Sequence, residues 1–175
     1  MSLPINWTHD THTIPEQGLE IGRAATADEC VALAEALEIL ACERLETRYA
    51  IKPMAGGQFL VTGSLEADVV QSCVVSLEPV AGRIVEPFEV DFWPPDKLPE
   101  PDSGELVLVA TADSEPIEDG AIPIGRIVYE HLAAGLDPYP RKEGAAFRWT
   151  EGDARPDGDR RDSPFAVLAK LKPKD

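Results

Sequence analysis

The sequence predicts an α+β fold: a twisted antiparallel β meander or partial barrel packed with two main helices, plus a short C-terminal segment. Residues 45–93 alternate between apolar and polar side chains, which is typical of half-buried antiparallel strands. Two other stretches, near residues 26–40 and 122–136, carry apolar side chains at helical spacing. A chain of 175 residues suits one domain with a tail, and we expect that domain to span residues 1–150.

The first elements are two short strands and a helix. Residues 5–7 and 19–21 are short apolar runs that suit strands. Thr26 and Glu29 then form a capping-box pattern, because each can bond the other's backbone N–H at a helix start. The apolar spacing that follows predicts a helix that runs to about Leu40.

Long extended segments come next. Residues 45–51 alternate as a strand with one buried face, and a turn is expected at residues 56–57. From residue 59 to residue 77 most odd-numbered positions carry apolar side chains, and a segment of this length is too long for one flat strand. Gly63 is therefore predicted to mark a bulge or bend, and Pro79 to end the segment.

The last strand of the meander is predicted over residues 84–93. A turn at residues 81–82 precedes it, and Phe88, Val90 and Phe92 share one face. Pro87 cannot donate to a ladder, so we place it at a sheet edge or a bulge.

An acidic, proline-rich loop is expected over residues 94–120, with one short strand at residues 106–109. A second helix starts near residues 122–124 and stops before the Asp-Pro pair at residues 137–138. His131 falls on the apolar face of this helix, where a histidine that packs at the core boundary is the ordinary interpretation.

The chain ends in a charged linker and a short apolar and basic segment. Residues 151–162 are polar and charge-mixed, so this linker can stay disordered. In residues 163–175 a serine N-cap is followed by apolar side chains at helical spacing, and Lys170 and Lys172 stand near the end. The segment is too regular for a free tail, and we expect it to dock back on the domain with these lysines exposed.

Charge is distributed unevenly along the chain. The net charge is −16, and residues 1–138 hold 7 Lys and Arg against 25 Asp and Glu. Such a body repels phosphate and is a poor clamp for bare nucleic acid, whereas basic protein partners are easier to attract. Neither a secretory leader nor a membrane-spanning apolar run is recognisable, so we expect a cytoplasmic protein with no membrane partner.

Cysteine spacing and motifs offer little chemistry. Cys30, Cys42 and Cys73 are too few and too scattered for a disulfide framework or a zinc site, and Cys30 falls on the core face of its helix. Nucleotide-binding and nucleophile-elbow motifs are missing, so no cofactor and no catalytic residue is predicted. Tyr139, Arg141 and Lys142 combine an aromatic side chain with cations, and we take them as candidate binding residues together with Lys170 and Lys172.

Three ordered segments give the chain a family resemblance: residues 71–79 leading into 87–92, residues 137–142, and residues 163–172. Together they resemble the YceD family of large ribosomal RNA subunit accumulation proteins, and the similarity covers residues 18–172. The acidic stretch before the second helix fits the same family. The motif residues are Cys73, Leu77, Glu78, Pro79, Asp137, Pro138, Pro140, Pro164 and Phe165.

The resemblance implies a non-enzymatic factor that supports accumulation or processing of large-subunit ribosomal RNA. The implied partner is a ribosomal protein or a pre-ribosomal particle, and direct RNA contact and oligomeric state stay open. Many relatives carry a second cysteine three residues after the first and have been described as metal-binding. Here Ser76 takes that position, and a hydroxyl does not replace a zinc-bound thiolate, so no metal is expected.

Two alternatives remain beside this interpretation. One is a hydrolase-type enzyme that uses His131 with nearby carboxylates in a cleft. The other is a plain structural or dimerising domain whose tail is part of its own core.

Overall fold

A computed structural model describes residues 3–97 and 113–146 of the chain. In order, its elements are β1 (His9–Asp10), β2 (Leu19–Ala24), α1 (Ala27–Ala36), β3 (Ala41–Pro53), β4 (Phe59–Ser72), β5 (Pro79–Trp93), β6 (Asp113–Pro116), β7 (Ala121–Ile122) and α2 (Ile124–Gly135). Two 3-10 turns, Thr11–Thr13 and Ala55–Gly57, lie between them. The sequence did not indicate β1, β6 and β7. The predicted strand at residues 106–109, the linker and the C-terminal segment lie outside the described residues.

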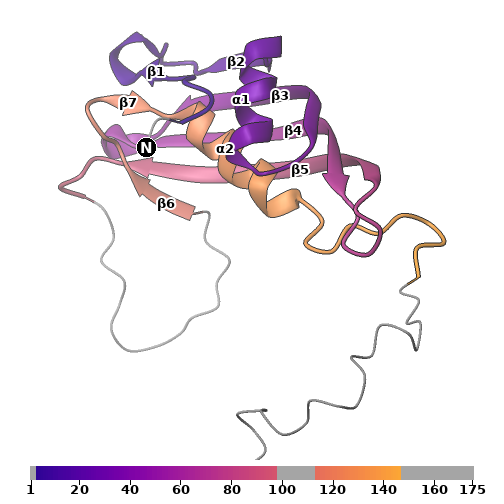
Figure 1. Cartoon of the computed structure of the whole chain (residues 1–175). Helices are drawn as coiled ribbons and strands as arrows, with labels where there is room; N and C mark the ends of the chain where they lie inside the picture. The colour runs from indigo at the N-terminus through magenta and orange to yellow at the C-terminus, as the bar shows by residue number, and fades with distance from the viewer. Residues whose placement is uncertain (1–2, 98–112, 147–175) are drawn as a thin grey trace, which may run out of the picture.

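The main sheet has five strands in the order β2-β3-β4-β5-β6. Strands β2 to β5 form an antiparallel meander, and β6 pairs parallel to the end of β5. Both helices lie on the same face of this sheet, α1 over β3 and α2 over β5 and β4 (Figure 1). The described residues leave the opposite face uncovered, and we call it the open face. The sheet does not close into a barrel within the described residues, so the α+β prediction is confirmed as an open meander with two helices.

The first helix begins where its capping box predicts. The Thr26 hydroxyl accepts from the Glu29 N–H at 3.2 Å, and the Glu29 carboxylate accepts from the Thr26 N–H at 2.8 Å. The helix ends at Ala36, earlier than the predicted residue 40. The reason is backbone geometry: Glu38 takes a left-handed φ of 54°, and the Ile39 N–H bonds back to the Ala34 carbonyl.

Side-chain alternation places the core correctly in β3 and β4. Leu45, Thr47, Tyr49 and Ile51 are all buried, and the same holds for Val61, Leu65, Ala67 and Val69. These apolar faces meet the helices, as period-two alternation requires. Cys30 is also buried, on the core side of α1.

Gly63 does not mark a bulge. It pairs in regular register with Tyr49 on one side and Phe88 on the other. A Cβ at Gly63 would lie 2.6 Å from the Phe88 ring and 2.7 Å from the Tyr49 Cβ, so the glycine makes room for two aromatic side chains. The register shift in this sheet falls instead on β3, between Cys42 and Arg44.

The predicted boundary between the last two meander strands is wrong. β4 ends at Ser72, the turn occupies residues 73–78, and Pro79 begins β5 instead of ending β4. The glycine-containing pair at residues 81–82 lies inside β5, paired with Val69 and Val70. Pro87 is at an edge as predicted: β4 pairs with it on one side, and on the other side β6 pairs only with residues 90–93 of β5, so no described strand reaches Pro87 there.

The N-terminal segment and α2 complete the core. Residues 5–7 are not a strand, but Ile5 and Trp7 are each 1% exposed and pack against α2, where Gly125 allows their backbone a close approach. The Gly125 N–H donates to the Trp7 carbonyl at 2.9 Å. α2 buries Ile124, Ile127, Val128 and Leu132, as its spacing predicts, and ends two residues before Asp137. Neither described helix is long and apolar enough to cross a membrane.

Candidate functional site

Two segments far apart in the sequence meet at one end of the sheet. The first is residues 71–79, where β4 turns into β5, and the second is residues 137–142, which follow α2. Figure 1 shows the loop after α2 lying beside this turn. We call the two segments together the junction.

Hydrogen bonds to main-chain carbonyls hold the junction closed. The Val74 N–H donates to the Pro140 carbonyl at 2.9 Å, and the Gln71 side-chain amide donates to the Asp137 carbonyl at 2.9 Å. Within the second segment, the Asp137 carboxylate accepts from the Tyr139 N–H at 2.9 Å, the geometry of an Asx turn. These contacts fix the backbone of residues 137–140 against the turn.

Lys142 adds two further contacts, one from its backbone and one from its side chain. Its N–H donates to the Sγ of Cys73 at 3.3 Å. Its ammonium group lies 2.7 Å from a carboxylate oxygen of Glu78, and this ion pair lowers the pKa of Glu78. Both Lys142 and Glu78 are about half exposed, so the ion pair contributes little stability by itself.

The thiol of Cys73 is the centre of the turn. Its side chain has no exposed surface, and its sulfur accepts from the backbone N–H groups of Val75 at 3.5 Å, Ser76 at 3.4 Å and Lys142. Such donors favour the thiolate, and the Lys142 N–H, followed by the Ser76 donors, lowers the pKa of Cys73 to about 6. The pKa of Cys42 is shifted in the opposite direction: burial, with Cys30 alongside, raises it to about 12.

The residues around Cys73 do not fit a structural zinc ion. Ser76 occupies the position of a second thiolate, and three backbone N–H groups already donate to the Cys73 sulfur. Within the described residues, no three His, Cys, Asp or Glu side chains gather as metal ligands would. In a structural zinc site a metal ion would join two such chain segments. Here the backbone N–H of Lys142 joins the second segment to the turn.

Leu77 is the most unusual residue of the junction. The alternation of the sequence predicts it on the buried face of a strand, but its side chain is 77% exposed. Its φ of 60° lies in the left-handed region, which a branched apolar residue rarely adopts. Exposure and backbone strain combine at one residue, and strain of this kind concentrates at functional sites.

The exposed part of the junction combines apolar, aromatic and cationic side chains. Tyr139 is 71% exposed and Val74 is 47% exposed. Arg141 is exposed and makes no hydrogen bond or ion pair with the residues that the structure describes. We call Val74, Leu77, Tyr139 and Arg141 the junction surface. Tyrosine and arginine are enriched among residues that dominate binding energies.

Most of the residues singled out in the sequence meet here. Cys73, Leu77, Glu78, Pro79, Asp137, Pro138 and Pro140 all belong to the junction, with Tyr139, Arg141 and Lys142. Lys170, Lys172, Pro164 and Phe165 lie outside the described residues. Sequence reasoning missed Val74 and Gln71, which bond across the junction. The one sequence signal for the turn that contains Val74 was Pro79, which has no N–H and therefore suits the first position of the next strand.

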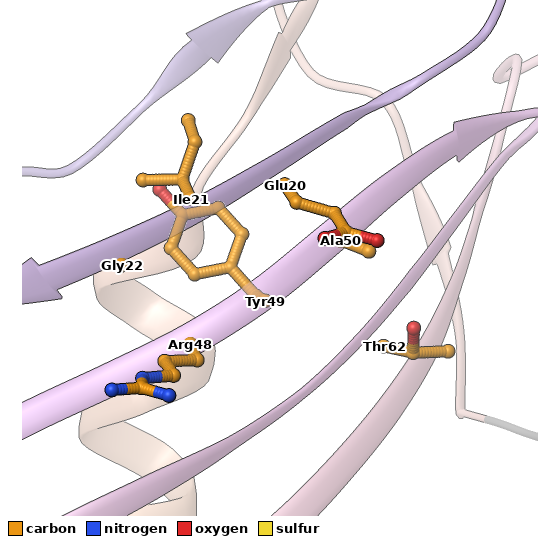
Figure 2. A pocket seen from close by; sticks show the side chains of 7 residues that line it. All are labelled: Glu20, Ile21, Gly22, Arg48, Tyr49, Ala50 and Thr62. Atoms are coloured by element: carbon orange, nitrogen blue, oxygen red, sulfur yellow. The ribbon is translucent and has the colours of Figure 1, made fainter.

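The open face of the sheet holds a shallow pocket of about 440 Å³ around Arg48. Glu20, Arg48, Ala50 and Thr62, from three adjacent strands, line it (Figure 2). Arg48 is exposed and has no hydrogen-bond or ion-pair partner among the described residues. Tyr49 also lines the pocket, but this residue is only 3% exposed and its hydroxyl is hydrogen-bonded to the His9 ring at 2.8 Å. Among the described residues the pocket therefore lacks the exposed aromatic surface on which single-stranded RNA binders stack bases.

Carboxylates dominate the rest of that face. Arg44 bridges Asp68 at 2.7 Å, Glu46 at 3.2 Å and Glu66 at 3.7 Å, and Arg83 bridges Glu66 at 2.6 Å. The arginines are thus engaged by a larger number of acidic groups. This network repels a phosphate backbone and leaves the face better suited to a basic protein.

His131 is not set up for catalysis by its described neighbours. Its ring is half-buried and packs against Phe88, with 5.6 Å between ring centroids. It makes no hydrogen bond or ion pair with a described residue, so neither a nucleophile nor an orienting carboxylate is in place. The geometry gives no support to a hydrolase built on His131.

Comparison with known proteins connects the junction to a family. A family model described as large ribosomal RNA subunit accumulation protein YceD matches residues 61–172, which is more than half of the chain and includes both junction segments. No curated protein and no solved structure matches the chain. The family description concerns the accumulation of large-subunit ribosomal RNA, a role in ribosome biogenesis. The chain belongs to the YceD family.

Proposed function

We propose that this protein supports the accumulation of large-subunit ribosomal RNA as a non-enzymatic binding factor. Its partner would be a ribosomal protein or a pre-ribosomal particle, met in the cytoplasm. The junction surface would make the specific contact, and the acidic open face would favour basic partners. This function extends the description of the family to a mechanism of binding.

One observation carries the proposal. Two of the motif segments, residues 71–79 and 137–142, are joined through Cys73, Val74 and Lys142 into a single surface. That surface exposes a leucine with strained backbone geometry and a tyrosine, and neither side chain belongs to the core. Retaining such groups in water is typical of a protein-binding surface.

The charge distribution supports a protein contact over contact with bare RNA. The described residues around the open face hold an excess of carboxylates, and Lys142 is paired with Glu78. Arg141 remains available for a directed contact. A few cations on an acidic body give weak binding to bare nucleic acid and stronger binding to basic ribosomal proteins.

The test is an affinity purification of the tagged full chain from cells at low and at high salt. We expect large-subunit ribosomal proteins or precursor particles at low salt, with a marked loss at high salt because screening weakens exposed charge pairs. A matched purification with Tyr139→Ala and Arg141→Ala should recover less. Recovery of neither ribosomal proteins nor precursor particles at low salt would contradict the proposal.

A further inference from the structure

A groove of about 530 Å³ lies beside the junction, where the ends of both helices meet residues 137–140. Its apolar lining includes Leu37 and Ile39 after α1, Leu136 after α2, and Val74 of the turn. All four side chains are partly or largely exposed in the described structure. The groove is thus an apolar surface that the described residues leave uncovered.

The electrostatics of the groove favour a cation. The C-terminal ends of α1 and α2 both reach it, and the negative end of each helix dipole points there. Neither helix has a basic residue in its last turn to offset this charge. Glu38 and Asp137 line the groove, no Lys or Arg does so, and the Glu38 carboxylate has no described partner.

One segment of this chain has matching chemistry. In residues 163–172, helical spacing gathers Pro164, Val167, Leu168 and Leu171 on one face, with Lys170 and Lys172 beside them. Ten residues of helix span about 15 Å, which suits a groove that faces two helix ends. The family match continues to residue 172, so the unit that defines the family includes this segment.

The tether is short enough to favour docking within the same molecule. Residues 137–140 form one wall of the groove, and the described chain ends at Ala146, six residues further on. The sixteen residues 147–162 can span roughly 50 Å when extended, so they reach any point of this groove. A tether of this length gives an effective concentration on the order of millimolar.

We propose that residues 163–172 dock in this groove of their own chain. Their apolar face covers Leu37, Ile39 and Leu136, and Lys170 and Lys172 lie toward Glu38, Asp137 and the two helix ends. This docking does not depend on the proposed function, because it concerns the free protein. It assigns the segment a structural place beside the junction surface.

Carbodiimide cross-linking of the full chain tests the docking, because this reagent joins a lysine to a carboxylate only when they touch. We expect cross-links from Lys170 or Lys172 to Glu38 or Asp137. The Lys142–Glu78 pair, at 2.7 Å, serves as the internal positive control in every sample. A mixture of isotope-labelled and unlabelled protein shows whether each link lies within one chain or joins two copies.

Two arginine variants give the matched comparison. Ala134→Arg places bulk and positive charge in the groove, at an exposed position of α2. Ala55→Arg adds the same side chain at an exposed position at the opposite end of β4. We expect Ala134→Arg to abolish the tail cross-links and Ala55→Arg to keep them. Absence of these cross-links in the wild-type chain, links between copies, or tail links that persist in Ala134→Arg would overturn the proposal.

Discussion

The backbone N–H of Lys142 donates to the Sγ of Cys73 at 3.3 Å, although 69 residues separate the two along the chain. This contact joins the turn between β4 and β5 to the segment after α2. In a zinc site a metal would make such a connection. Here a buried sulfur and backbone donors make the connection, so the junction surface does not depend on a bound metal ion.

Removal of the Cys73 sulfur should loosen the junction. In Cys73→Ala the partly buried N–H groups of Val75, Ser76 and Lys142 lose their acceptor, and the loss of these hydrogen bonds destabilises the junction. We expect a lower urea midpoint and faster hydrogen exchange of the Val74 N–H, which bonds across the junction. Ser76→Ala is the control, since it keeps every backbone donor. An unchanged Val74 exchange rate in Cys73→Ala would contradict this account.

The pKa of Cys73 should make stability depend on pH. The pKa is about 6 in the folded chain, whereas the ordinary value of the thiol is 9.0, so between these values the unfolded chain holds a proton that the folded chain has released. The free energy of unfolding therefore rises from pH about 6 to about 9, and the gain is lost as the pH falls through 6. Urea titrations of the wild type and Cys73→Ala should diverge over this range. A constant difference between the two proteins would show that the thiol does not ionise there.

Gly63 should tolerate no side chain, whereas Gly22 in the neighbouring part of the sheet should. A Cβ at Gly63 would meet the Arg48 carbonyl and the Phe88 ring at 2.6 Å, so Gly63→Ala should cost about 1–3 kcal/mol or more. At Gly22 the nearest atom is 3.9 Å away, and Gly22→Ala should be neutral or slightly stabilising. Thermal unfolding of both variants checks the pair. Equal stability of the two would contradict the packing described around Gly63.

Much of the fold follows from local rules that operate within a few residues. The Thr26–Glu29 capping box sets the start of α1, and alternation from Leu45 to Ile51 identifies the buried face of β3. The errors arise where tertiary packing decides. The sequence cannot show that Gly63 is required by two aromatic side chains on other strands. Nor can the sequence show that the strand stops before Cys73, because apolar side chains continue at every second position beyond it.

The candidate site was predictable as residues but not as a surface. Cys73, Tyr139 and Arg141 stand out in the sequence, yet nothing in it shows that residue 142 bonds to residue 73. Leu77 gives no local signal, because leucine is not a residue that favours a left-handed backbone. Its exposure depends on a turn that long-range contacts hold in place.

Leu77 separates binding from stability. In Leu77→Gly the left-handed strain disappears, so the free energy of unfolding should rise by about 1 kcal/mol, while the exposed apolar contact is lost. Asp119→Gly is the control, because Asp119 also has a positive φ, of 51°, in a turn outside the junction. Calorimetry or denaturant titration of both variants checks the stability change.

The most direct test of the junction surface is the affinity of these proteins for isolated precursor large-subunit particles at low salt. We predict that Leu77→Gly binds roughly tenfold more weakly than the wild type although it is the more stable protein. Asp119→Gly should bind as the wild type does. If Leu77→Gly binds as tightly as the wild type, the junction is not the surface through which this protein acts.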